Sequence, residues 1–403
     1  MAITIIEQPY EGSPAHNPLI YKVSTSNYAQ PNIRVVADVY VDAVQVARLK
    51  PFIDYNSLNE STIDISDIVS SYVGADAAEC VNASGGDTIL YNSKAAVQVK
   101  FGEEYGSTPT VYANLADSTE RNIYNIALPY NTYVDWQTSM PAFGISGGRY
   151  AITNFNGTRY VIDGQRAVMC ALKDYFVPGS PTQYPYAILR QYDKDGNLLD
   201  TNEVQLTNQI GDDAYYCSVN VMELFTKQWN TAYFTFCFSA IVLIALPPPF
   251  DKGYNNGYLY TYYYEEANCR HDVYRVHWLN RLGGWDSFNF KAQSKVSYNV
   301  ERKTYNNDEP RVPYSNHDFR KKHTRIKYDK SVVLNSDWIT EAEAEWLEEI
   351  ITSPIVLIEN NGVLYSAMVT NNSYDRRESS YDDKLINMQL NIDYSQSNFT
   401  QHG

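Results

Sequence analysis

The chain has 403 residues, 44% of them hydrophobic and 20% charged, and its formal net charge is −15. This composition is typical of a globular protein, and a chain this long buries a core without disulfide or metal cross-links. The five cysteines are far apart and include no Cys-x-x-Cys pair, which excludes a disulfide framework and a zinc site. We expect reduced cysteines in a protein synthesised in a cytoplasm. The first residues lack the features of a signal peptide.

The N-terminal part begins with a proline-punctuated arm and continues as short strands. Ile33–Val41 and Val44–Leu49 predict a hairpin around Asp42-Ala43, and Ala95–Gly106 predicts another strand. Ser61–Val73 shows short helical spacing. Short strands separated by Gly, Asn and Ser are typical of a β-sandwich, so we assign residues 1–128 to an arm followed by a β-sandwich-like domain.

The middle part, residues 129–250, repeats this style and predicts a second β-sandwich-like domain. Two hairpins are expected, one from Tyr150–Phe155 and Thr158–Ile162 across Asn156-Gly157, and one from Tyr186–Tyr192 and Leu198–Leu206. The connection Asp193–Asn197 resembles a partial calcium loop, but it lacks the terminal bidentate acid and its flanks read as strands, which favours a turn. The apolar run Phe234–Leu246 has 13 residues, fewer than the roughly 20 that cross a bilayer, and predicts a buried strand.

Residues 251–403 predict a β-rich domain that carries a single amphipathic helix. The helix starts at the capping box Thr340–Glu343 and stops at Ser353-Pro354. Strands are expected at Ile355–Ile358, Val363–Val369 and Leu385–Tyr394. The fold class is therefore all-β with minor α, as tandem β-sandwich-like domains followed by this C-terminal domain.

Two aromatic stretches lie at the start of this domain. Tyr258, Tyr260 and Tyr262 share one face of a strand, and we take them as a candidate aromatic contact surface, for a neighbouring subunit or for a glycan. Tyr274–Phe290 predicts a core hairpin whose turn uses Gly283 and Gly284.

This hairpin also carries a resemblance. Cys269, Trp278-Leu-Asn280, Gly283-Gly284, Trp285-Asp286 and Phe290 form a block that resembles virion proteins of tailed phages infecting Bacteroidetes, including the crAss-like gut phages. Further similarity lies at Pro14–Tyr21 with Val39–Val41, and at Trp346–Val356. The resemblance implies a structural part of the tail, neck or baseplate. It carries over no catalytic residue.

The charge of the chain is unevenly distributed. Residues 291–330 hold eleven basic and five acidic side chains, a net of +6, so the rest of the chain carries −21. The sharpest cluster is Arg320, Lys321, Lys322 and Arg325, our candidate inter-subunit contact. The alternatives are a solvated loop and contact with DNA phosphates in a channel, although the acidic body disfavours general nucleic-acid binding.

No motif indicates catalysis, a metal or a cofactor. Gly144–Gly148 matches the letters of a nucleophile elbow but lacks the strand before it and the helix after it. His271 and His277 are a weak metal signal. We therefore expect a non-enzymatic, ring-forming virion protein, assembled in the host cytoplasm, whose partners are its own copies and other tail or neck proteins and not a membrane. The alternatives are a receptor- or glycan-binding tail protein and a glycan-cleaving enzyme, because a carboxylate pair can be hidden in a sequence.

Overall fold

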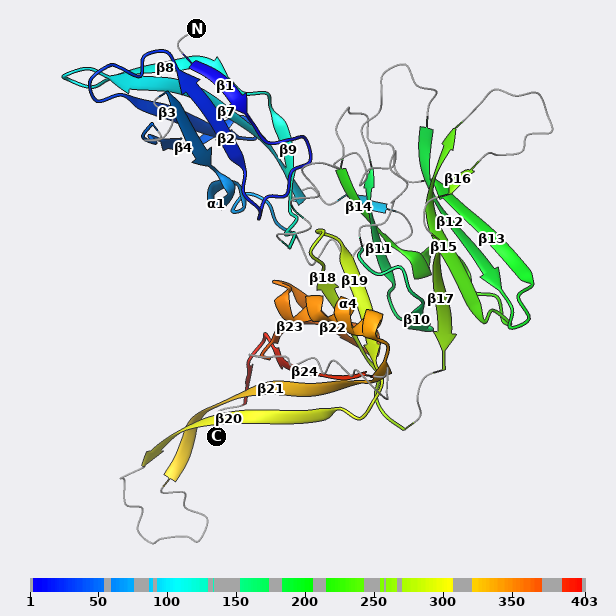
Figure 1. Cartoon of the computed structure of the whole chain (residues 1–403). Helices are drawn as coiled ribbons and strands as arrows, with labels where there is room; N and C mark the ends of the chain where they lie inside the picture. Colours follow the sequence, from blue (N-terminus) through cyan, green and yellow to red (C-terminus); the bar gives the residue numbers. More distant parts are fainter. Residues whose placement is uncertain are drawn as a thin grey trace, which may run out of the picture. The chain divides into compact units, whose positions relative to one another are not determined.

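The computed structural model describes residues 3–53, 59–75, 87–89, 93–129, 133, 153–173, 183–205, 215–242, 254–256, 259–266, 270–306, 321–371 and 386–400. Strands predominate in these residues and helices are few, which confirms the predicted all-β fold with minor α (Figure 1). The chain forms two compact units. Unit 1 comprises residues 1–156, 168–260 and 280–285, and unit 2 comprises residues 157–167, 261–279 and 286–403. The division into three domains at residues 128 and 250 stays a prediction.

The N-terminal part of unit 1 is a two-layered sandwich. One sheet has the order β1-β2-β5, and the other has the order β4-β3-β7-β8, with β9 pairing β7. Both sheets contribute to one core, in which the rings of Tyr21 and Phe101 lie 5.8 Å apart. The strands are β1 (Ile3–Glu7), β2 (Ile20–Thr25), β3 (Arg34–Val41), β4 (Val44–Leu49), β5 (Glu60–Asp64), β7 (Lys94–Tyr105), β8 (Thr110–Asp117) and β9 (Arg121–Tyr124).

Local turn chemistry explains why this part was predictable. Asp42 and Ala43 have φ of 49° and 64°, the left-handed conformations of a tight hairpin turn, and β3 pairs β4 across them as predicted. The strand expected near Ala95 is β7. The helix predicted from the spacing at residues 61–73 is only partly present. β5 occupies the start of this segment, and α1 (Ser66–Val69) is only four residues long.

The rest of unit 1 consists of a three-stranded sheet and a hairpin with added strands. The first has the order β11-β14-β6, and in the second β12 pairs both β13 and β15, with β16 on the far side of β15. The strands are β6 (Asp87–Ile89), β11 (Val168–Lys173), β12 (Gln183–Tyr192), β13 (Leu198–Gln205), β14 (Tyr215–Asn220), β15 (Tyr233–Val242) and β16 (Tyr254–Asn256), and the 3₁₀ helix η4 spans Val221–Glu223. The apolar run is a strand as predicted, with Phe234, Phe236 and Phe238 buried.

The connection between β12 and β13 is a turn held by its own aspartate. The Asp193 carboxylate accepts hydrogen bonds from the backbone amides of Asp195 and Asn197 and from Asn197 Nδ2, at 2.8–2.9 Å. The Asn197 side-chain bond is the main reason that the pKa of Asp193 is lowered. The carboxylate is thus engaged in closing the hairpin, which supports the prediction of a turn.

The hairpin predicted across Asn156-Gly157 is wrong. Residues 153–158 form no strand, and Tyr150 lies outside the described residues. β10 (Arg159–Ile162) pairs instead in parallel with β17 (Tyr260–Glu265), with Arg159 opposite Tyr262. A local turn signal could not reveal a partner about 100 residues further along the chain.

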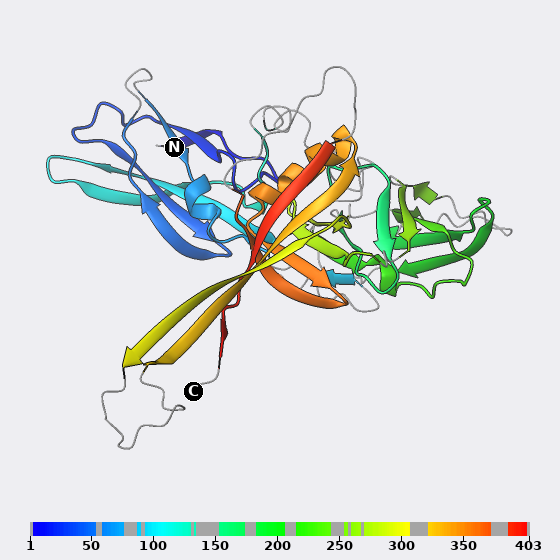
Figure 2. The ribbon, with the colours of Figure 1, turned by 90° about the horizontal axis from the view of Figure 1, so that it is seen from below.

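The main sheet of unit 2 has the order β19-β18-β22-β23-β24-β21-β20, with β25 pairing β21 (Figures 1 and 2). Its strands are β18 (Tyr274–Leu279), β19 (Trp285–Phe290), β20 (Lys295–Asn306), β21 (Lys321–Ile339), β22 (Val356–Asn360), β23 (Val363–Val369), β24 (Ile386–Tyr394) and β25 (Asn398–Phe399). β24 confirms the predicted alternation, with Met388, Leu390 and Ile392 buried.

Helix α4 (Glu341–Thr352) packs on β18 and β24. Its capping box is present as predicted: the Glu343 amide donates to Thr340 Oγ1 at 3.3 Å, and the Thr340 amide donates to Glu343 Oε2 at 2.8 Å. Ser353 is extended and ends the helix before Pro354. The buried face includes Leu347 and Ile350, so the helix closes the core of unit 2.

The predicted core hairpin is present as β18 and β19, but both faces of β18 are buried, not one. All six residues from Tyr274 to Leu279 are buried, including Arg275 and His277. Trp278 is fully buried, and its ring lies 5.0 Å from that of Trp346 on α4. The turn uses Gly283 at φ +81°, as expected for its glycine.

We expect Trp278→Ala to lower the free energy of unfolding by roughly 3–5 kcal/mol, because it removes a buried ring and leaves a cavity. Chemical denaturation would measure this loss. Trp229→Ala is the matched control, since Trp229 is 93% exposed and its removal should change stability by less than about 0.5 kcal/mol. Equal stabilities of the two variants would show that Trp278 is not part of the core.

Candidate functional site

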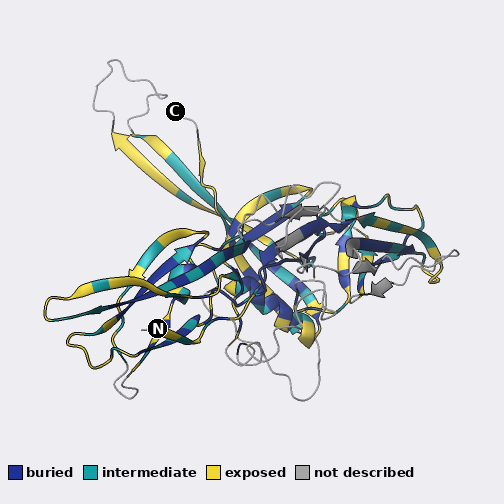
Figure 3. Ribbon diagram, turned by 90° about the horizontal axis from the view of Figure 1, so that it is seen from above, coloured by how far each residue is buried: buried dark blue, intermediate teal, exposed yellow. Residues whose placement is uncertain are grey.

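The predicted basic cluster lies on the outer half of β21. Lys321 and Arg325 are exposed and Lys322 is half-buried, while Arg320 lies outside the described residues. β21 pairs β20 in an antiparallel hairpin, with Lys295 opposite Val333 and Asn306 opposite Lys321. We call residues 295–306 and 321–331 the ribbon. None of its residues is buried, and it runs on past the other strands of its sheet (Figures 2 and 3).

The ribbon concentrates the positive charge of the segment. It holds eight cationic and two acidic side chains, a net of +6, against −21 in the rest of the chain. Lys327 pairs with Asp329 at 3.4 Å, and Arg325 and Lys330 lie over the rings of Phe399 and Tyr394. In the described part of the chain, five cations make no ion pair: Lys295, Arg302, Lys303, Lys321 and Lys322. The charge is therefore largely available to a partner.

The two faces of the ribbon differ in chemistry. Opposite residues in an antiparallel pair share a face. Val300 lies opposite Tyr328, and the next position inward on the same face of β20 is Tyr298, which is 60% exposed. This face continues the buried side of the sheet at Val332 and Leu334. On the other face Glu301 lies opposite Lys327, and Lys303 opposite Arg325. The ribbon is therefore amphipathic. The face we call apolar holds most of its aromatic and aliphatic side chains, with Arg302 and Lys330 among them, and it extends beyond the core.

This apolar face was not predicted from the sequence. The signal was present, because Val296, Tyr298 and Val300 follow a two-residue period, as do Ile326 and Tyr328. The density of lysines and arginines in the same segment masked it.

The second predicted surface is not exposed. Tyr260 and Tyr262 are 2% and 1% accessible, and Tyr258 lies outside the described residues. The prediction of an aromatic contact surface is therefore wrong for Tyr260 and Tyr262. Alternation on the strand grouped these residues correctly, but their face is directed inward, while Tyr263 on the other face is 42% exposed.

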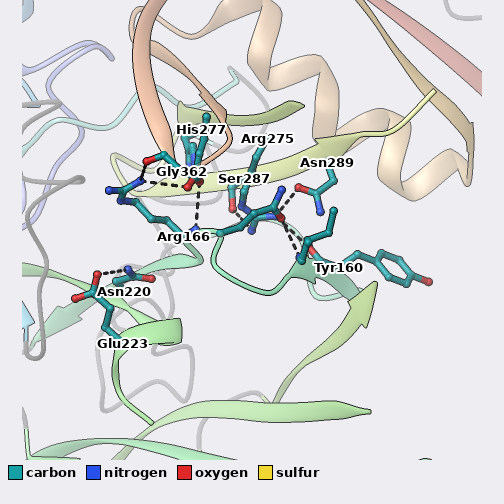
Figure 4. A network of polar contacts seen from close by, with 12 residues as sticks. Tyr160, Arg166, Asn220, Glu223, Arg275, His277, Ser287, Asn289 and Gly362 are labelled. Atoms are coloured by element: carbon teal, nitrogen blue, oxygen red, sulfur yellow. Dashed lines mark hydrogen bonds and ion pairs between the residues drawn. The ribbon is translucent and has the colours of Figure 1, made fainter. Parts of the chain in front are cut away.

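A network of buried polar side chains supports the sheet of unit 2 (Figure 4). Arg275 on β18 donates from Nη1 to the carbonyl oxygen of Tyr160 at 3.0 Å and to Asn289 Oδ1 at 2.9 Å, and from Nη2 to Ser287 Oγ at 2.7 Å. Burial lowers the pKa of Arg275 to about 10, so it remains charged at neutral pH. Nearby, Arg159 pairs with Asp286 at 2.9 Å, and Trp346 Nε1 donates to the other oxygen of that carboxylate at 3.1 Å.

A second group in this network joins β18 to β22. His277 Nε2 lies 3.0 Å from Glu359 Oε2, and Arg166 Nη1 lies 3.1 Å from Glu359 Oε1. Burial lowers the pKa of His277, and the charges of Arg275 and Arg166 act in the same direction. Burial tends to raise the pKa of Glu359, but the bonds from His277 and Arg166 outweigh it and lower it. A neutral His277 that donates to an ionised Glu359 is consistent with the lowered pKa of both groups.

These groups are engaged in holding strands together. In the described part of the chain, no three His, Cys, Asp or Glu residues are arranged to hold a metal ion. His277 is occupied by Glu359, and Gly144–Gly148 lies outside the described residues. Cys170 and Cys237 are buried, and the Cys170 sulfur accepts a hydrogen bond from the Trp285 amide at 3.3 Å. No described helix combines the length and apolar character needed to span a membrane.

No family model matches the chain, and no curated protein matches it. Among solved structures, a β-glucuronidase from Parabacteroides merdae aligns at 11% identity with a TM-score of 0.14, over 66% of this chain and 30% of that chain. The full extracellular region of plexin A4 aligns at 7% identity with a TM-score of 0.18, over 97% and 31%. The chain thus spans about a third of the length of these structures, and similarity at these TM-scores carries no argument.

The buried histidine predicts a pH-dependent stability. Since the pKa of His277 is lowered in the native state, the unfolded chain binds one more proton as the pH falls below the ordinary histidine value of about 6.5. The free energy of unfolding should therefore fall with pH from that point. We expect His277→Gln to make this fall shallower between about pH 7 and pH 5 in denaturation experiments. His323→Gln, at an exposed histidine, should keep the wild-type slope. An unchanged slope in His277→Gln would contradict the assignment.

Proposed function

We propose that this protein is a structural component of a phage virion, in the tail, neck or baseplate, and that it assembles into a ring through the ribbon. Its action is to fill interfaces and not to turn over a substrate. Assembly would occur in the host cytoplasm, and the partners are further copies of the chain and neighbouring tail or neck proteins. The resemblance of the hairpin at Trp278–Phe290 to such virion proteins supports a location in the virion. The ribbon supports assembly through contacts between subunits.

The observation that carries the proposal is the exposure of an amphipathic ribbon. A two-stranded hairpin is marginally stable in water without further cover. Tyr298 and Val296 on its apolar face are 60% and 39% exposed, so the described part of the chain covers that face only in part. A subunit packed on this face would bury these side chains and order the ribbon.

Charge complementarity favours a second copy as the partner. The ribbon carries +6 and the rest of the chain −21, so opposite fields attract the ribbon of one copy to the body of the next. Contact between different surfaces is head-to-tail, and a head-to-tail contact closes into a ring when its rotation permits. Contact of the ribbon with DNA phosphates is the competing interpretation, and the tests below separate the two.

The direct experiment is electron microscopy of the purified protein. Ring-shaped particles support the proposal. A monomer at all concentrations and salt conditions would overturn assembly through self-association.

The charge of the ribbon can be tested by replacing Arg320, Lys321, Lys322 and Arg325 together with serine. Exposed ion pairs are each worth only about 0–1 kcal/mol, so the monomer should remain folded by circular dichroism. Sedimentation should show weaker assembly that depends less on salt than in the wild type. Normal assembly at every salt concentration would contradict the prediction. Normal assembly combined with particles that no longer hold DNA would favour phosphate contact.

The apolar face can be tested separately with Tyr298→Ser. Burial of the Tyr298 ring at an interface is worth on the order of 1.5–3 kcal/mol, so assembly should weaken by about tenfold or more. Tyr28→Ser is the matched control, since Tyr28 is 50% exposed on unit 1 and should not affect assembly. Equal association constants for the two variants, measured by sedimentation, would remove the apolar face from the interface.

A further inference from the structure

Unit 2 contains a cavity of about 220 Å³ beside the N-terminus of α4. Its walls come from β10, β17, β19 and β21 and from the start of the helix. The lining side chains used below are Tyr160, Glu265, Asn289, Lys291, Trp338 and Glu343. Pockets that enclose drug-sized ligands measure roughly 300–1,000 Å³, so this one suits a single ring.

A β-bulge turns Trp338 into this site. Between Asn335 and Trp338, β21 has one residue more than β24, and Asp337 in the bulge has φ +67°. Val332, Leu334 and Ser336 are buried at alternate positions, and unbroken alternation would bury Trp338 as well. The extra residue instead leaves Trp338 64% exposed. A left-handed non-glycine residue is uncommon and is retained where the surrounding structure requires it.

Both cations that line the cavity are in ion pairs, and Glu343 adds one further negative charge. Lys291 pairs with Glu265 at 2.8 Å and lies over the Tyr160 ring at 5.5 Å. Arg159, which also lines the cavity, is paired with Asp286. Glu343 caps α4 through one carboxylate oxygen. With both cations in ion pairs and Glu343 carrying a further negative charge, the site favours a neutral polar ligand over an anionic one.

Hydrogen-bonding capacity remains in the wall. Asn289 is 3% accessible, and its Oδ1 accepts from Arg275, but its buried Nδ2 makes no hydrogen bond in the described part of the chain. A buried donor without a partner is uncommon in proteins and costs free energy. The Asn289 amide is sealed from the cavity, and the donors and acceptors that face a ligand beside the exposed indole ring come from Lys291, Glu265 and Glu343.

We propose that this cavity binds one neutral sugar ring of a glycan. A sugar has an apolar face of C–H groups that fits an aromatic ring, and a rim of hydroxyls that both donate and accept. The Trp338 ring receives the C–H face, while the Lys291–Glu265 pair and the Glu343 carboxylate bond the hydroxyls. This site differs from the tyrosine surface considered from the sequence, and it does not depend on assembly through the ribbon.

The test uses the full-length protein and glucose, galactose, mannose and N-acetylglucosamine as separate probes. Saturation-transfer NMR on the sugar protons and tryptophan fluorescence report binding. We expect at least one probe to bind with a dissociation constant on the order of 1 mM, as befits a ligand of about a dozen non-hydrogen atoms.

Two variants and one control make the test specific. Trp338→Ala should weaken binding at least about tenfold and Lys291→Met several-fold, with both proteins folded because neither side chain is fully buried. Trp229→Ala removes another exposed indole and should bind as the wild type does. The proposal is overturned if no neutral sugar binds more tightly than roughly 10 mM. It is also overturned if Trp338→Ala binds as well as Trp229→Ala.

Discussion

The buried guanidinium of Arg275 is the constraint on which the rest of unit 2 depends. A charge removed from water needs acceptors for most of its donors, and losing a partner of a buried charge costs about 3–5 kcal/mol. Both Nη atoms of Arg275 are bonded, while its Nε makes no hydrogen bond in the described residues. Here the acceptors come from β10 and β19, on segments far apart in sequence. These strands therefore hold fixed positions beside β18. A sliding strand would leave a buried cation without its acceptors, so the network selects one register.

The same hydrogen-bond network also fixes the orientation of the exposed ribbon relative to the core of unit 2. β18 is held to β22 by the bonds among His277, Glu359 and Arg166, and β22 continues through β23 and β24 to β21. β21 is 19 residues long, with one end leading into α4 and the other in the ribbon. The exposed ribbon and part of the buried core are thus formed by the same strand, β21. An interface on such a strand is presented in a defined orientation, which reduces the entropy lost on binding.

Features set by neighbouring residues could be predicted from the sequence. The capping box at Thr340 and Glu343 and the turns at Asp42-Ala43 and Asp193–Asn197 are local, because the residues that make each bond are within five positions of one another. Features set by distant packing could not. The parallel partner of β10, the inward direction of Tyr260 and Tyr262, and the unpaired donor of Asn289 all depend on segments that meet only in the folded chain. The bulge before Trp338 also could not be predicted from the two-residue period of the strand, because the extra residue is apparent only when β21 is compared with its partner strand β24.

The pairing of β21 with β24 has a mechanical consequence. Their antiparallel register runs from Ser331 opposite Asp393 to Ile339 opposite Ile386. Hydrogen bonds in an antiparallel pair lie across the strands. A pull on the ribbon along β21 would therefore strain these bonds together, in shear, and not one after another as when a strand is peeled from its end. Shared loading of this kind resists tension, so the strand that carries the ribbon is also the part of unit 2 best arranged to transmit force.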